Sequence, residues 1–126
     1  MEKIENDAIC FWIEDGILHS EYKYPFTMTI DNSLEIYNLR KEISKGVPQY
    51  FCYDISNLKS MTGEARKYGE KHGLFDLAAS AIIVNSHVTM FIYNMFLKLH
   101  KVEIPTKAFY SKSEAVIWLK QLKQGK

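Results

Sequence analysis

The sequence predicts an α/β protein that begins with a β-hairpin and continues with helices and strands in alternation. An Asp15-Gly16 pair separates two β-prone runs near the N-terminus, and such a pair is a strong hairpin signal. Short, almost wholly apolar runs then alternate with longer segments in which apolar residues recur at helical spacing. This order predicts a mixed sheet covered by crossover helices.

The composition is that of a folded domain. The chain has 126 residues, of which 47% are hydrophobic and 25% charged, so it is long enough to bury its own core. We expect a single domain over residues 1–126. The 16 basic residues nearly balance the 15 acidic residues, and this balance predicts no nucleic-acid partner.

The first ten residues are charged and lack the apolar run of a secretory signal. The sequence also lacks the roughly 18 uninterrupted apolar residues of a membrane span. We therefore expect a cytoplasmic protein without membrane insertion. Cys10 and Cys52 lie in apolar, strand-like runs, which predicts two buried free thiols rather than a disulfide.

The hairpin strands are predicted over residues 8–14 and 17–23. The residues that follow contain a proline, which marks a strand edge or end. A helix is predicted over residues 31–46, where Asn32 and Glu35 have the spacing of a reciprocal N-terminal cap. A glycine at its last position predicts the end of this helix.

The central part of the chain predicts two buried strands around one charged helix. Residues 49–55 form a short apolar run, as expected of a strand that is buried on both faces. Residues 63–72 predict a helix that Gly69 and Gly73 break. A second buried strand is predicted around residues 81–84.

The last part of the chain predicts a helix, a strand and a further helix. The first helix covers residues 87–101, and the strand covers residues 106–110. The final helix, over residues 111–122, has a capping box formed by Ser111 and Glu114.

The helix over residues 87–101 is apolar around most of its circumference. One stripe consists of Val88, Phe91, Met95 and Leu99. Further apolar residues are Met90, Ile92, Tyr93, Phe96 and Leu97. Such a helix is buried within its own domain, in a partner, or against an apolar ligand, and the sequence leaves these three alternatives open.

No complete catalytic motif is present, and the four histidines have no metal-ligand spacing. We therefore predict no metal, no cofactor and no enzyme activity. His87 follows a buried strand and either faces a ligand or lies in the first turn of a helix capped by Ser86. Asp54 ends another strand and either acts as an acid or base or caps the next turn.

The chain resembles the SpoIIAA-like family of small bacterial proteins, which belongs to the STAS-like group, named for sulfate transporters and anti-sigma-factor antagonists. The similarity lies in "AIIVNSHVTMFIYNMFLKLH", "PTKAFYSKSEAVIWLKQL" and "YDISNLKSMTGEAR". These segments contain Asn94, Phe96, Pro105, Phe109 and the Ala115–Leu119 helix, and the resemblance covers roughly residues 8–122. It implies a mixed sheet of four or five strands with helices packed against it.

The resemblance also implies a candidate regulatory role for the segment after residue 54. In anti-sigma-factor antagonists, a serine at a helix N-terminus there is phosphorylated, which adds about two negative charges. Asp54 and Ser56 match the start of that segment, but Thr62 and Gly63 take the place of its Asp-Ser pair. Glu64 adds a fixed carboxylate, so we expect Ser60 and Thr62 to have structural roles.

These observations together predict a bacterial, non-catalytic binding module that regulates through protein–protein interaction without the phosphoserine switch. The alternative is a carrier or sensor of a small apolar, lipid-like ligand. The partners expected are a second copy of the chain, a regulatory protein, or that ligand. The candidate surface consists of Asp54, Ser56, Ser60, Thr62, Glu64, Ser86, His87, Phe91 and Met95.

Overall fold

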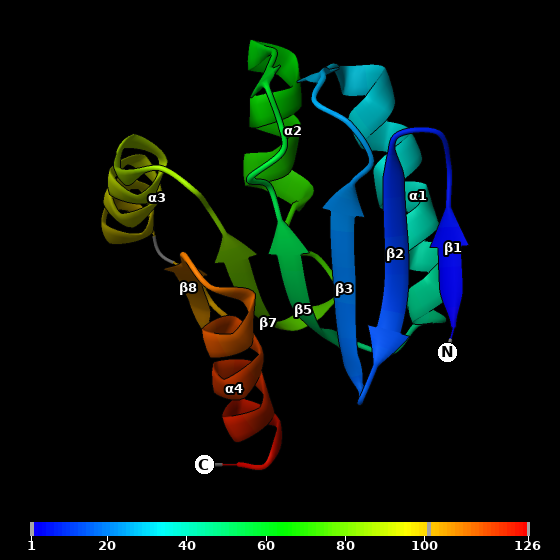
Figure 1. The fold of residues 1–126 in the computed structure, drawn as a ribbon, viewed down its shortest axis with the longest axis vertical. Helices are drawn as coiled ribbons and strands as arrows, with labels where there is room; N and C mark the ends of the chain where they lie inside the picture. Colours follow the sequence, from blue (N-terminus) through cyan, green and yellow to red (C-terminus); the bar gives the residue numbers. More distant parts are fainter. Residues whose placement is uncertain (1, 101, 126) are drawn as a thin grey trace.

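The computed structural model describes residues 2–100 and 102–125, in which six strands form one sheet and two short strands form a second (Figure 1). The strands of the main sheet are β1 (Lys3–Glu5), β2 (Ile9–Glu14), β3 (Ile17–Tyr22), β5 (Gln49–Asp54), β7 (Leu77–Ile83) and β8 (Thr106–Phe109). The second sheet pairs β4 (Thr27–Met28) with β6 (Ser60–Met61). The helices are α1 (Ile30–Ser44), α2 (Gly63–His72), α3 (His87–Leu99) and α4 (Lys112–Lys123).

The main sheet is mixed, as predicted. Strands β1, β2 and β3 are antiparallel, whereas β3, β5, β7 and β8 run parallel, in the order β1-β2-β3-β5-β7-β8. Asp15 and Gly16 have φ values of 53° and 78°, which confirms the predicted hairpin turn.

The prediction of four or five strands is wrong, because the main sheet has six strands within the described residues. The strand that the sequence did not predict is β1. Lys3 pairs with Trp12 and Glu5 pairs with Cys10 across this edge. Three residues that include two charges have no apolar alternation, so the sequence carries no strand signal there. Charged side chains are common on edge strands, where they discourage pairing with other chains.

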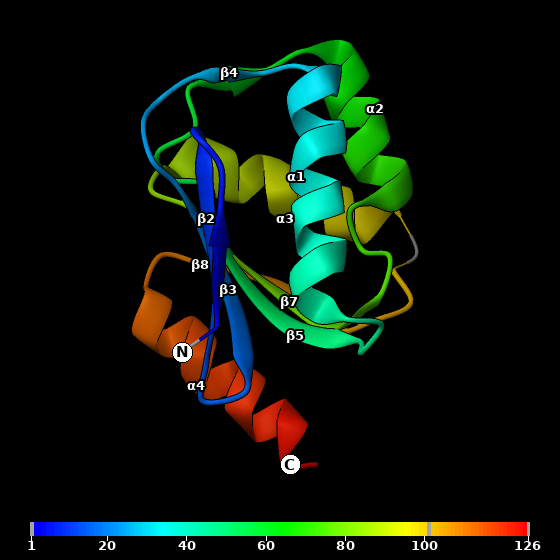
Figure 2. The ribbon, with the colours of Figure 1, turned by 90° about the vertical axis from the view of Figure 1, so that its right-hand side faces the viewer.

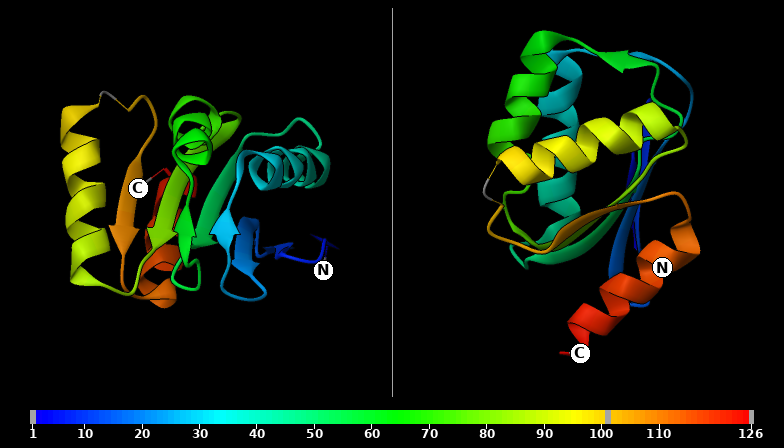
Figure 3. Two further views of the ribbon diagram at one scale, coloured as in Figure 1. Left: turned by 90° about the horizontal axis from the view of Figure 1, so that it is seen from above. Right: turned by 90° about the vertical axis from the view of Figure 1, so that its left-hand side faces the viewer.

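The helices cover the two faces of the sheet unequally. Helices α1 and α2 lie on one face and α4 lies on the other (Figures 2 and 3). Helix α3 lies along the β8 edge, on the side of α1 and α2 (Figure 3, left). The face opposite α1 and α2 is therefore covered by α4 alone.

Alternate residues of the strands fill a core on each face. The cluster under α4 consists of Ile17, Cys52, Ala79, Ala81, Ile83, Phe109, Ala115 and Leu119. The cluster under α1 consists of Ile9, Phe11, Leu18, Ile43, Phe51 and Leu77. Cys10 and Cys52 are free thiols as predicted, although only Cys52 is fully buried, where burial raises its pKa to about 11.

The start of α1 differs from the sequence prediction. Its N-cap is Thr29, whose hydroxyl accepts the N–H of Asn32 at 3.2 Å, while the Asn32 side chain accepts the N–H of Thr29 at 3.0 Å. Asn32 therefore takes the position that glutamate has in the usual capping box, and Glu35 is not part of it. The sequence correctly predicted a reciprocal cap at the start of this helix, but the cap lies three residues earlier, at Thr29 and Asn32.

Three further helix and strand boundaries can be compared with the sequence predictions. Gly69 lies inside α2, and only Gly73 ends that helix. Strand β7 begins at Leu77, earlier than predicted. Helix α4 begins at Lys112, and the hydroxyl of its N-cap Ser111 accepts the N–H of Glu114 at 3.4 Å. This confirms the Ser111 half of the predicted capping box. Met1, Lys101 and Lys126 belong to the predicted domain but lie outside the described residues. Lys101 is also the last residue of the predicted 87–101 helix.

Candidate functional site

Helix α3 presents an apolar face to solvent. Every residue of α3 is at least partly exposed. The exposed fractions are 69% for Val88, 65% for Phe91, 59% for Ile92, 42% for Met95 and 74% for Leu99. We call these five residues the α3 apolar face. Burial within the monomer, one of the three alternatives for this helix, is therefore wrong for this stripe.

The opposite side of α3 attaches the helix to the sheet. Met90 and Tyr93 pack against a small cluster that includes Ile82 and Val84 of β7 and its end. The hydroxyls of Tyr93 and Tyr53 lie 2.7 Å apart, and burial raises the pKa of Tyr93 well above its usual value. The helix is thus held by one side, which leaves the apolar face free for a partner.

The spacing of the exposed residues is typical of a helix–helix contact. Val88, Ile92, Met95 and Leu99 are separated by four, three and four residues, which places them on one stripe, as in a coiled-coil seam. Lys98 is the one Lys, Arg, Asp or Glu in the sequence of this helix. The sequence analysis left Ile92 out of the candidate surface, although a count of this 4-3-4 spacing points to it.

The residues at the start of α3 are local supports. The Ser86 hydroxyl caps the helix by accepting the N–H of Thr89 at 3.1 Å. The Nδ1 atom of His87 lies 2.9 Å from the Tyr110 hydroxyl, and the two rings meet edge to face. His87 is therefore a first-turn residue that connects α3 to the end of β8.

The segment after β5 is held by short-range hydrogen bonds. Asp54 Oδ1 accepts the N–H of Ser56 at 2.9 Å and also contacts the Ser56 hydroxyl. Asp54 thus caps the next turn, which was one of its two predicted roles. The Ser60 hydroxyl lies 2.8 Å from that of Thr27, across the β4–β6 pair.

Thr62 begins α2, as the sequence analysis expected. Its hydroxyl accepts the N–H of Ala65 at 3.2 Å, and Glu64 lies in the first turn, where a carboxylate interacts favourably with the helix dipole. The candidate residues of this segment therefore hold their own loop. Among the residues that the structure describes, no group of three His, Cys, Asp or Glu side chains could hold a metal ion.

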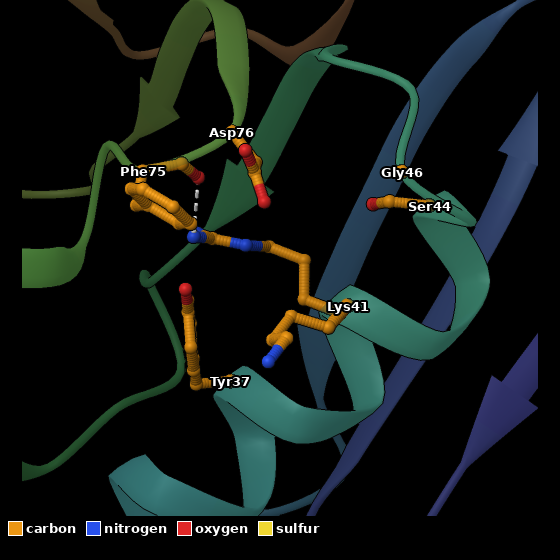
Figure 4. A pocket seen from close by; sticks show the side chains of 7 residues that line it. Tyr37, Lys41, Ser44, Gly46, Phe75 and Asp76 are labelled. Atoms are coloured by element: carbon orange, nitrogen blue, oxygen red, sulfur yellow. Dashed lines mark hydrogen bonds between the residues drawn. The ribbon is translucent and has the colours of Figure 1, made fainter.

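A second feature, missed by the sequence analysis, is a buried arginine in a small cavity of about 90 Å³. Arg40 Nη1 donates to the carbonyl of Gly73 at 2.8 Å. Nη2 donates to the carbonyl of Phe75 at 3.0 Å, which is the dashed line in Figure 4. The guanidinium also lies over the rings of Tyr37 and Phe51, at 5.3 and 5.6 Å from their centroids. These contacts hold α1 against the turn between α2 and β7.

Comparison with known proteins places the chain in a family. A family model described as "Domain of unknown function (DUF7793)" matches residues 11–123. The chain belongs to this family. No curated protein matches the chain. No helix within residues 2–100 and 102–125 has the length and apolar character needed to cross a membrane.

A solved structure confirms the predicted fold. It is described as an uncharacterized protein from the DUF3478 family with a SpoIIAA-like fold, from Shewanella loihica PV-4. It is similar to this chain with a TM-score of 0.69 and 20% sequence identity, over 94% of this chain and 99% of that chain. The SpoIIAA-like fold that the sequence predicted is therefore present in this member of the DUF7793 family.

Proposed function

We propose that the protein is a non-catalytic binding module that pairs with a second copy of itself through the α3 apolar face. The observation that carries the proposal is the exposure of five large apolar side chains on one stripe of a helix already anchored on its other side. A contiguous apolar patch of this kind marks an interaction site.

The size of the face fits a dimer. With roughly 150 Å² for a fully exposed large side chain, the exposed fractions correspond to on the order of 450 Å² of apolar surface per copy. A standard interface buries about 800 Å² per partner, of which somewhat more than half is apolar. The α3 apolar face alone therefore supplies the apolar share of a standard interface.

The charge pattern favours a second copy over a charged partner. A two-fold interface places the same residues of both chains together, so like charges on the face would oppose association. The sole Lys or Arg in α3 is Lys98, and the helix has no Asp or Glu. The long aliphatic stem of Lys98 lets its ammonium group reach water at the edge of an apolar contact. Two such helices pack together without burying an unpaired carboxylate.

The alternative of an apolar-ligand carrier loses support at α3. Phe91 and Met95, which belong to the predicted candidate surface, are 65% and 42% exposed and lie on an outward face. Residues on an open convex face do not enclose a small molecule. The α3 apolar face is therefore better suited to contact with another protein than to a small ligand. We further propose that the dimer regulates another protein.

The test is the oligomeric state of matched variants, measured by sedimentation velocity. Ile92→Glu adds a charge to the centre of the α3 apolar face. Ile117→Glu adds the same charge to α4, at a side chain of nearly equal exposure (57% against 59%). We expect the native protein and Ile117→Glu to be dimers and Ile92→Glu to be a folded monomer. A native protein that stays monomeric at high micromolar concentration, or a dimeric Ile92→Glu, would refute the proposal.

A further inference from the structure

A groove of about 570 Å³ lies beside α4, over the β2–β3 hairpin, on the face that α1 and α2 leave free. Trp12 and His19 contribute from the two strands, and Val116 and Ile117 contribute from α4. The volume falls within the usual range for a small-molecule site. This groove is separate from the α3 apolar face, because it is formed by other elements on the opposite side of the sheet.

His19 is the unusual residue of the groove. It is 94% buried and pairs with Trp12 across the strands, where the two rings are nearly parallel with centroids 5.1 Å apart. Its Nδ1 atom has no hydrogen-bond partner among the described residues. Buried polar atoms normally have one. Nδ1 is covered from solvent, and no hydrogen bond among the described residues fixes the tautomer of the ring.

The surroundings of His19 favour its uncharged imidazole. Burial is the main cause that lowers the pKa of His19, and the nearby ammonium group of Lys112 lowers it further. A neutral imidazole has one N–H donor and one acceptor nitrogen. The groove thus contains a side chain that can either donate to a ligand or accept from it.

The charged groups at the groove are already paired. The Nζ atom of Lys112 lies 3.6 Å from Oε2 of Glu21, and the Nζ atom of Lys120 lies 3.4 Å from Oδ2 of Asp15. The Glu14 carboxylate accepts the indole N–H of Trp12 at 3.2 Å. A charged ligand would have to compete with these contacts, so the charge pattern favours an uncharged one.

Apart from Ser113, the rest of the lining is apolar. Trp12 is half-buried, and Ile117 is 57% exposed on a helix whose Ala115 and Leu119 are fully buried in the core. Ile117 and Val116 face the hairpin across the groove. The His19 ring stacks on Trp12, and Lys112 Nζ lies 5.3 Å from the centroid of the Trp12 ring. A planar apolar molecule that contacts the exposed part of the indole and these aliphatic side chains would remove apolar surface from water.

We propose that this groove binds an uncharged molecule with a planar apolar body and one N–H or O–H group, which forms a hydrogen bond with the imidazole of His19. Trp12, Val116 and Ile117 hold the body, and His19 selects for the polar group. The site does not depend on the dimer proposed above.

Indole and 1-methylindole are matched probes, because they share a planar body and differ in the N–H group. Each is titrated into the full ¹⁵N-labelled chain and followed by NMR. We expect indole to shift the side-chain indole signal of Trp12, and the α4 amides near residue 116, in a saturable manner. 1-Methylindole should bind about tenfold more weakly, as expected from the loss of one hydrogen bond.

The variants separate this site from other apolar surfaces. His19→Phe keeps the stacked ring and should abolish the preference for indole over 1-methylindole. Ile117→Lys, at an exposed position that leaves the core intact, should weaken both probes, whereas Ile92→Glu should weaken neither. Equal affinities for the two probes, tighter binding of the charged indole-3-acetate, shifts confined to α3, or no saturation up to the solubility limit would each overturn the proposal.

Discussion

Replacing Arg40 with methionine should destabilise the protein without altering its surface. The guanidinium donates to two backbone carbonyls, at 2.8 and 3.0 Å, and lies over two aromatic rings. Methionine has a similar stem and keeps part of the packing, but it offers no donor. The carbonyls of Gly73 and Phe75 would then lose their side-chain partner in a partly buried position.

The magnitude follows from these contacts. A hydrogen bond with a charged partner contributes about 1.5–3 kcal/mol, so the two bonds together set an upper bound of roughly 6 kcal/mol. Methionine also removes the cost of burying the guanidinium, which is several kcal/mol for an ion and which the nearby Asp76 carboxylate offsets only in part, since the two form no ion pair in the described structure. The net loss should therefore be about 2–3 kcal/mol in the free energy of unfolding, or roughly 6–15 °C in Tm for a domain of this size.

Urea unfolding followed by circular dichroism measures this loss, with Lys41→Met as the control because Lys41 is the exposed neighbour. Arg40→Lys keeps the charge but not the forked geometry, so it should lose nearly as much stability as Arg40→Met. A loss below about 0.5 kcal/mol for Arg40→Met would refute the reasoning, since surface substitutions alone account for that much. Full stability in Arg40→Lys would assign the effect to charge rather than to the two directed hydrogen bonds.

Two further predictions concern a histidine and a helix cap. Because burial holds the pKa of His19 below its usual value of 6.5, the unfolded chain binds a proton at His19 more readily than the folded chain does. Its contribution to stability is fully present above about pH 6.5 and is lost as the pH falls below that value. As the pH falls from 7.5 to 5, the native protein should therefore lose stability relative to His19→Phe, as measured by the free energy of unfolding. A difference between the two proteins that does not change with pH would contradict a depressed pKa. Thr62→Ala should cost about 1 kcal/mol in the same assay, since it removes the α2 N-cap, whereas Thr62→Ser should cost little; equal losses would assign the effect to the methyl group.

Features that depend on a few neighbouring residues could be predicted from the sequence. The Asp15-Gly16 turn, the N-caps Thr62, Ser86 and Ser111, and the strand-and-helix order all arise from local backbone preferences. The α1 cap was displaced because Thr29 precedes the apolar pattern that marked the helix.

Features that depend on packing between distant elements could not be predicted. The sequence shows that α3 is apolar nearly all round, but which stripe is covered depends on its position along the β8 edge. His19 lies in an ordinary strand pattern, and only the packing of α4 against the hairpin makes it a buried ring whose Nδ1 has no hydrogen-bond partner among the described residues. Arg40 likewise becomes a clamp only because the turn before β7 brings two carbonyls to it.

The start of α2 bears on how a binding module of this kind would be regulated. The Thr62 hydroxyl is occupied as the acceptor of the Ala65 N–H, and Glu64 places a permanent negative charge in the first turn. Phosphorylation switches an interface because the charge comes and goes, whereas the charge of Glu64 is constant. Under the proposed function, control therefore passes to α3, where pairing depends on protein concentration by mass action. A partner that competes for the α3 apolar face would then act by shifting the dimer to the monomer.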